Sequence, residues 1–83
     1  MPYIKEDRRL DLNDDPWCAE DAGELNYIIT RLVIDFATRY NDPPNYSDWN
    51  EVIGVLECAK QECYRMGLAP LEDQKIKSHG GLY

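Results

Sequence analysis

The stretch AGELNYIITRLVIDFATRY, residues 22–40, decides the fold class of this chain. Its apolar residues recur every three or four positions, the spacing that gathers side chains on one face of an α-helix. They are Ala22, Leu25, Ile28, Ile29, Leu32, Val33, Phe36, Ala37 and Tyr40. The β-branched run at 28–30 favours a strand when taken alone, but the sustained helical period outweighs it. We therefore predict an amphipathic helix.

A second amphipathic pattern follows a break in the chain. The break is NDPPN, residues 41–45, whose two prolines bar a continuous helix. Asn45 or Ser47 can then cap a new helix. Its apolar positions are Trp49, Val52, Ile53, Leu56, Ala59, Cys63 and Met66. Gly67 followed by Pro70 predicts a stop or a kink at its end.

The two ends of the chain are predicted to be arms. The first arm permits one short helical turn docked by Ile4 and Leu10, and Asp14 or Asp15 before Pro16 has the form of a helix start. The expected boundaries within one small domain, 1–83, are an arm at 1–14, a helical region at 16–40, a loop at 41–46, a helix at 47–67 and a C-terminal arm at 68–83.

The predicted fold is all-α, a helical hairpin with N- and C-terminal arms. Two amphipathic helices cannot fully cover each other's apolar faces, and hydrophobic burial barely offsets chain entropy in 83 residues. Disulfides and metal ions are the usual remedies in small domains, and the sequence indicates neither. We therefore expect homo-oligomerisation to complete a helical bundle.

The composition restricts the classes of partner. The net charge is −7, and residues 1–58 hold 5 Lys/Arg against 13 Asp/Glu, while residues 59–83 hold 4 against 3. An acidic chain without a basic stripe is a poor ligand for nucleic-acid polymers and for anionic membranes. A small anionic ligand stays compatible, because one or two cations can hold it. The charged N-terminus lacks the apolar core of a signal peptide, so we expect a cytosolic setting.

Metal-binding and catalytic sites have little support in the sequence. Three cysteines, with Cys58 and Cys63 diverging on one helix, predict reduced thiols and no zinc site. Glu20, Asp21 and Glu24 could hold a hard cation, but such a run more often forms the acidic start of a helix. His79 beside Ser78 lacks an orienting third group. We expect no catalytic residues, no metal and no cofactor.

Lys60, Tyr64 and Arg65 form a candidate binding group for a small anionic ligand. Lys60 and Tyr64 are four residues apart and share a helix face, and Arg65 is adjacent. A cation beside an aromatic ring can hold a phosphate and stack a base. The alternative is that Tyr64 packs in the bundle while Arg65 pairs with Glu62.

Three stretches of the sequence carry a family resemblance. They are MPYI at the start, GELNY with IT at 23–30, and the tail from Asn50, which reads NEVIGVLECAKQECYR, AP, EDQKI and GLY. The chain resembles a family of short uncharacterised proteins of bacteriophages and prophages. It departs from that pattern at Met66, Leu71 and Gly81, where the family is expected to carry Arg, Tyr and Asp. The resemblance implies a phage origin and the cytoplasm of an infected host.

Small phage proteins without enzymatic activity often act by stoichiometric binding, and one class resembles sponges that sequester nucleotide immune signals between subunits. On that analogy the ligand is a cyclic ADP-ribose or cyclic dinucleotide. Arg65 and Lys60 would bind phosphate, Tyr64 or Tyr27 would stack the base, and Asn26 or Glu57 would contact ribose or base edges. Lys75 and Tyr83 would close the pocket from a neighbouring subunit. The alternatives are an acidic inhibitor that docks on a host enzyme and a small virion component.

Overall fold

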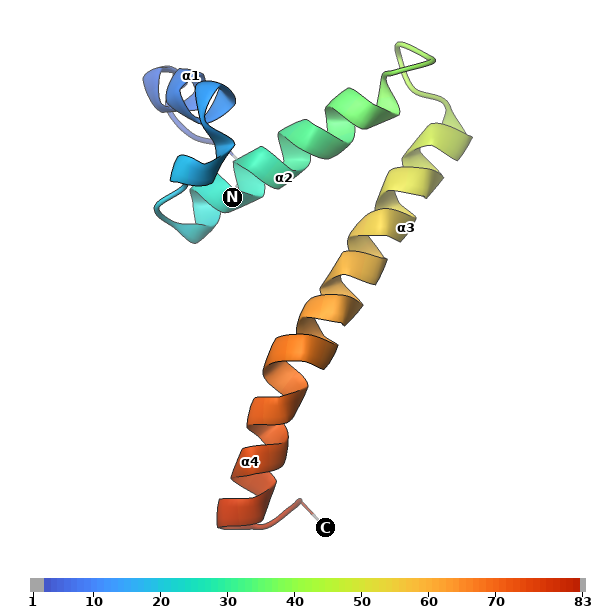
Figure 1. Ribbon diagram of the computed structural model, residues 1–83. Helices are drawn as coiled ribbons and strands as arrows, with labels where there is room; N and C mark the ends of the chain where they lie inside the picture. Colours follow the sequence, from blue (N-terminus) through green and yellow to red (C-terminus); the bar gives the residue numbers. More distant parts are fainter. Residues whose placement is uncertain (1–2, 83) are drawn as a thin grey trace. The chain divides into compact units, whose positions relative to one another are not determined.

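A computed structural model describes residues 3–82 of the chain (Figure 1). Every regular element in this range is helical, so the predicted all-α class is confirmed. The elements are α1 (Glu6–Asp14), the 3₁₀ turn η1 (Pro16–Cys18), α2 (Ala22–Ala37), α3 (Tyr46–Cys63), the π turn η2 (Tyr64–Leu68) and α4 (Ala69–His79). They form two compact units, Met1–Val52 (unit 1) and Ile53–Tyr83 (unit 2), and each is described here by itself.

The N-terminal arm of the prediction contains a full helix. Glu6 and Asp7 occupy the first turn of α1, where negative charge is favourable beside the helix dipole. Leu12 is 1% exposed, whereas Leu10 is 64% exposed. The docking residue of α1 is therefore Leu12 and not the predicted Leu10, because residues two positions apart on a helix point about 200° apart and only one of them can face the core.

The predicted helical region at 16–40 is divided into two elements. Asp15 accepts a hydrogen bond from the backbone N–H of Trp17 and starts the short turn η1. The Asp21 carboxylate then caps α2, accepting from the N–H of Glu24 at 2.8 Å. A residue that serves as an N-cap has a non-helical backbone, so the cap at Asp21 separates η1 from α2.

The start of α3 follows the prediction of a capped helix after a proline loop. Asp48 N–H donates to Asn45 Oδ1 and Asn45 N–H donates to Asp48 Oδ2, both at 2.9 Å. This reciprocal arrangement is that of a capping box, with an aspartate in place of the usual glutamate. Asn45, and not Ser47, is therefore the cap, and the helix begins at Tyr46.

The helix does not stop at Gly67. It continues through η2 into α4 and ends at His79, so the part of the predicted C-terminal arm from Leu68 to His79 is helical (Figure 1). A proline inside an α-helix clashes with the carbonyl four residues earlier. The wider π turn just ahead of Pro70 displaces the carbonyls there, which is how α4 accommodates the ring in its first turn.

The hydrophobic core of unit 1 is small. Among residues 3–82 the buried apolar side chains are Leu12, Ala37 and Val52. They come from α1, α2 and the first turns of α3. Unit 2, taken by itself, is a single helical course with no side chain buried among residues 53–82. One isolated helix gains little stability from propensity alone, so most of unit 2's apolar surface is left without a partner inside the unit.

Candidate functional site

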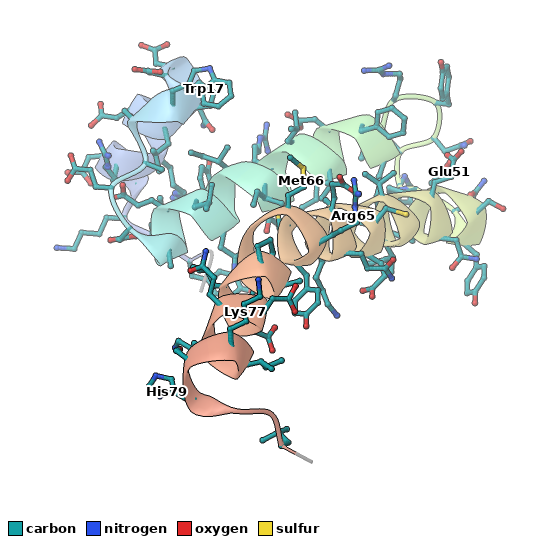
Figure 2. All side chains as sticks on the ribbon, turned by 60° about the horizontal axis from the view of Figure 1, so that its bottom comes forward. Trp17, Glu51, Arg65, Met66, Lys77 and His79 are labelled. Atoms are coloured by element: carbon teal, nitrogen blue, oxygen red, sulfur yellow. The ribbon has the colours of Figure 1, made fainter. Side chains whose placement is uncertain are left out.

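The predicted cation–aromatic group lies where α3 passes into the π turn. The backbone N–H of Ala69 donates to the carbonyl of Tyr64, five residues earlier, which is the π-helical pattern. Such a turn holds about one residue more than an α turn, so it shifts every following side chain by about 100°. Figure 2 marks the turn by Arg65 and Met66. π turns of this kind are frequent at functional sites.

This shift of phase decides which side chains share a face. In a regular helix, the side chains of two residues eight positions apart point about 80° apart around the axis. The extra residue of a π turn between them reduces this angle to about 20°. Tyr64 and Glu72 are placed in this way, and the Glu72 carboxylate raises the pKa of the Tyr64 phenol as an acceptor for its proton and as a negative charge. Leu68 comes into line with Lys60 for the same reason.

A shallow hollow lies along this face of unit 2. Its lining residues are Lys60, Gln61, Cys63, Tyr64 and Leu68. Its surface is mostly apolar, and it includes the phenol ring of Tyr64 and the side chains of Leu68 and Lys60. An apolar surface with an aromatic ring and a cation at its edge can accept a flat ring and a charged group attached to it.

The cations of the group are each held by an acid of the same helix. Lys60 Nζ lies 3.4 Å from Glu57 Oε1, and Arg65 forms an ion pair with Glu62. The alternative in which Arg65 pairs with Glu62 is therefore correct for the chain alone. All four side chains are more than half exposed, so these pairs contribute little and can exchange for a stronger anion.

The other predicted site residues are distributed over the chain. Asn26 and Tyr27 lie on α2 in unit 1, where Asn26 Oδ1 accepts from Thr30 and the Tyr27 hydroxyl donates to Asn13 at 3.0 Å. Lys75 lies on α4, exposed. Tyr83 lies outside the described residues. Glu57, Lys60, Tyr64 and Arg65 are thus the predicted site residues that lie close together, at the end of α3 and the start of η2.

The tightest polar cluster of the structure was missed by the sequence analysis. The Arg8 guanidinium donates from Nε and Nη2 to the two carboxylate oxygens of Glu24, each at 2.8 Å, and from Nη2 to the Cys18 carbonyl. These hydrogen bonds lower the pKa of Glu24 to about 2 and raise the pKa of Arg8. The cluster ties α1 to α2. An arginine and a glutamate sixteen residues apart carry no periodic signal, so the pattern could not reveal it.

The same contacts decide between the two interpretations of the acidic residues at 20–24, a cation site or the start of a helix. Glu24 is occupied by Arg8, and Asp21 caps α2. Within residues 3–82 no group of three His, Cys, Asp or Glu side chains is arranged to hold a metal ion. The acidic run is therefore the start of a helix. The Ser78 hydroxyl donates to the Gln74 carbonyl in its own helix, while Figure 2 shows His79 projecting from the end of α4.

Comparison with protein families identifies the family of this chain. The sequence model of a family described as a domain of unknown function, DUF6899, matches residues 1–82. The chain belongs to the DUF6899 family. No curated protein and no solved structure matches this DUF6899 protein. None of its described helices combines the length and apolar character needed to cross a membrane.

Proposed function

We propose that this DUF6899 protein is a non-enzymatic phage protein that self-associates and sequesters a small nucleotide-derived immune signal in the host cytoplasm. The observation that supports the proposal best is the π turn of unit 2. It aligns Lys60, Tyr64 and Leu68 along one hollow and leaves Arg65 beside it. These are the groups that a phosphorylated heterocycle requires: cations for the phosphate, and a ring and an apolar surface for the base.

The local ion pairs are compatible with such a ligand. A phosphate presents several strong acceptor oxygens, and charge-assisted hydrogen bonds to it are stronger than exposed Lys–Glu and Arg–Glu pairs in water. Glu57 and Glu62 would be released when Lys60 and Arg65 turn to the ligand. The hollow is open on its outer side, so a neighbouring subunit would close it, with Lys75 and Tyr83 as the proposed contributors.

Titration calorimetry of the purified protein with a panel of cyclic ADP-ribose species and cyclic dinucleotides tests this proposal. We expect binding without turnover for at least one member, with affinity reduced about tenfold by Tyr64→Ala because base stacking is lost. Lys60→Ala should weaken binding by a similar factor. The matched controls are Tyr46→Ala and Lys77→Ala, which remove the same groups elsewhere. Absence of heat with every nucleotide would refute the proposal.

A second candidate is an inhibitor that docks on a host protein. It is favoured by the negative charge of residues 1–58, which contain 13 Asp/Glu and 5 Lys/Arg. It is also favoured by the ion pairs that Lys60 and Arg65 already form with acidic residues of the same chain. A pull-down from host lysate distinguishes the two functions. A stoichiometric host protein supports docking, whereas a nucleotide released by heating the purified protein supports sequestration.

A further inference from the structure

The most apolar row of α2 is turned to the outside of unit 1. At about 100° per residue, four side chains fall within about 60° of one another on this helix. They are Leu25, Ile29, Leu32 and Phe36, here called the α2 stripe, and their exposed fractions are 52%, 40%, 68% and 47%. A surface helix normally shows the opposite arrangement, with its apolar row toward its own core.

The other side of the same helix packs against its own unit. The side chains there are buried or half-buried, and they include Tyr27, Ile34 and Ala37. Tyr27 is bonded to Asn13, between α1 and α2, and Ala37 belongs to the core of unit 1. The α2 helix is thus apolar on two sides, and its own unit covers only one of them, which leaves the α2 stripe available for a partner.

A groove continues the stripe toward η1. Its lining includes Leu25, Ile29 and Leu32 of the stripe, Leu12, Pro16 and Trp17 from α1 and η1, and the charged pair Arg31 and Asp35. Trp17 is 95% exposed, and Figure 2 shows it at the rim of unit 1. The stripe and Trp17 together expose on the order of 600 Å² per copy, against about 800 Å² per partner in a stable complex.

The spacing of the stripe allows it to pair with a second copy of itself in the antiparallel direction. Its spacings are four, three and four residues, so the order of positions is the same in both directions along the helix. In a two-fold dimer each residue i that contacts j is matched by j contacting i. Two antiparallel copies of α2 centred between Ile29 and Leu32 meet this condition, with Leu25 opposite Phe36 of the second copy.

The charges at the ends of the stripe fit the same arrangement. Arg39 lies over the Phe36 ring, with Cζ 5.0 Å from its centroid, at one end. Asp21 caps the helix at the other end. Antiparallel pairing brings Arg39 of one copy beside Asp21 of the second, where opposite charges attract, whereas parallel pairing would set like charges side by side.

We infer that the α2 stripe is the self-association surface of this protein, and that a second copy covers it with an antiparallel α2. This inference rests on the self-association in the proposed function and names its surface, but it does not require the nucleotide. Calorimetry can therefore fail for every nucleotide while the dimer is observed, so the two failures are distinguishable.

Analytical ultracentrifugation of the full chain without ligand tests the surface. We expect the wild type to dimerise in the micromolar range or to form larger assemblies, and Leu32→Glu to shift it to the monomer. The matched control is Leu10→Glu, because Leu10 is 64% exposed in the same unit but lies on α1, outside the stripe. A monomeric wild type, or association that survives Leu32→Glu but not Leu10→Glu, overturns the inference.

Disulfide trapping tests the direction of the helices by an independent readout. The three native cysteines are replaced by alanine, and chains carrying Leu25→Cys or Phe36→Cys are mixed and oxidised. Antiparallel pairing predicts a mixed disulfide between the two variants and little cross-linking of either variant alone. A disulfide between two copies of the Leu25→Cys chain, or no cross-link at all, would overturn the antiparallel arrangement.

Discussion

The replacement Leu12→Ala tests most directly how unit 1 is held together. Leu12 is the largest fully buried side chain among the described residues, at 1% exposed, and it docks α1 on α2. The change removes three carbon atoms from the core, which costs about 2.4 kcal/mol of transfer free energy at ~0.8 kcal/mol per group. The remaining cavity adds to this cost, and Leu→Ala changes in cores span about 2–5 kcal/mol. We expect the free energy of unfolding to fall by about 3 kcal/mol.

The assay is urea unfolding followed by circular dichroism, with Leu10→Ala as the matched control. Both changes are Leu→Ala in α1, so their helix-propensity terms are equal and cancel in the comparison. Because Leu10 is 64% exposed, its replacement should cost less than about 1 kcal/mol. If Leu12→Ala cost no more than Leu10→Ala, α1 would not be docked through Leu12 and our account of this core would be refuted.

Three further predictions concern charge, helix propensity and the π turn. Arg8 lowers the pKa of Glu24 from 4.5 to about 2, so the stabilising effect of the Glu24 carboxylate is complete above pH 4.5 and is lost as the pH falls toward 2. The difference in free energy of unfolding between the wild type and Glu24→Gln should therefore shrink over that range, and a constant difference would contradict the prediction. Gly54→Ala should stabilise α3 by about 0.5–1 kcal/mol in thermal unfolding, because an added Cβ meets no atom within 4 Å; a fall in stability would reveal a contact not described here. Glu72→Gln should move the pKa of Tyr64 down toward its usual value in an NMR titration of the phenol carbon, and an unchanged pKa would separate the two side chains.

Helical periodicity was the most informative signal in the sequence. It predicted the helix at 22–40, which the structure places at Ala22–Ala37, and the proline loop with a cap at Asn45. These features depend on neighbouring residues alone, so local pattern suffices. The helix at Glu6–Asp14 was underestimated as a short turn, because its stability comes from Leu12 and Arg8 contacting distant residues.

The orientation of a helix is a different problem from its existence. Periodicity predicted a single apolar face from all the apolar residues of 22–40, some of which the structure packs inside unit 1 while Leu25, Ile29, Leu32 and Phe36 stay exposed. We also expected some apolar surface to be left for other copies. Periodicity could not show which side of α2 faces its own chain, since that depends on where α1 contacts it, through Arg8 and Leu12. The Lys60–Tyr64 pair follows from local spacing in the same way. Gly67 and Pro70 predict only a stop or a kink, whereas the structure has a π turn that aligns Leu68 and Glu72 with this pair.

Because of the π turn, the number of residues between Tyr64 and Leu68 determines the direction of the α4 side chains. Removing one residue between Tyr64 and Leu68 would restore an ordinary helix, rotate α4 by about 100° and draw it in by about 1.5 Å. Exchanging a side chain within the turn does neither. An insertion or deletion in the π turn would therefore change the direction in which Leu71 and Ile76 point from the helix. The same change in the loop before Asn45 would leave the direction of every α4 side chain relative to α3 as it is.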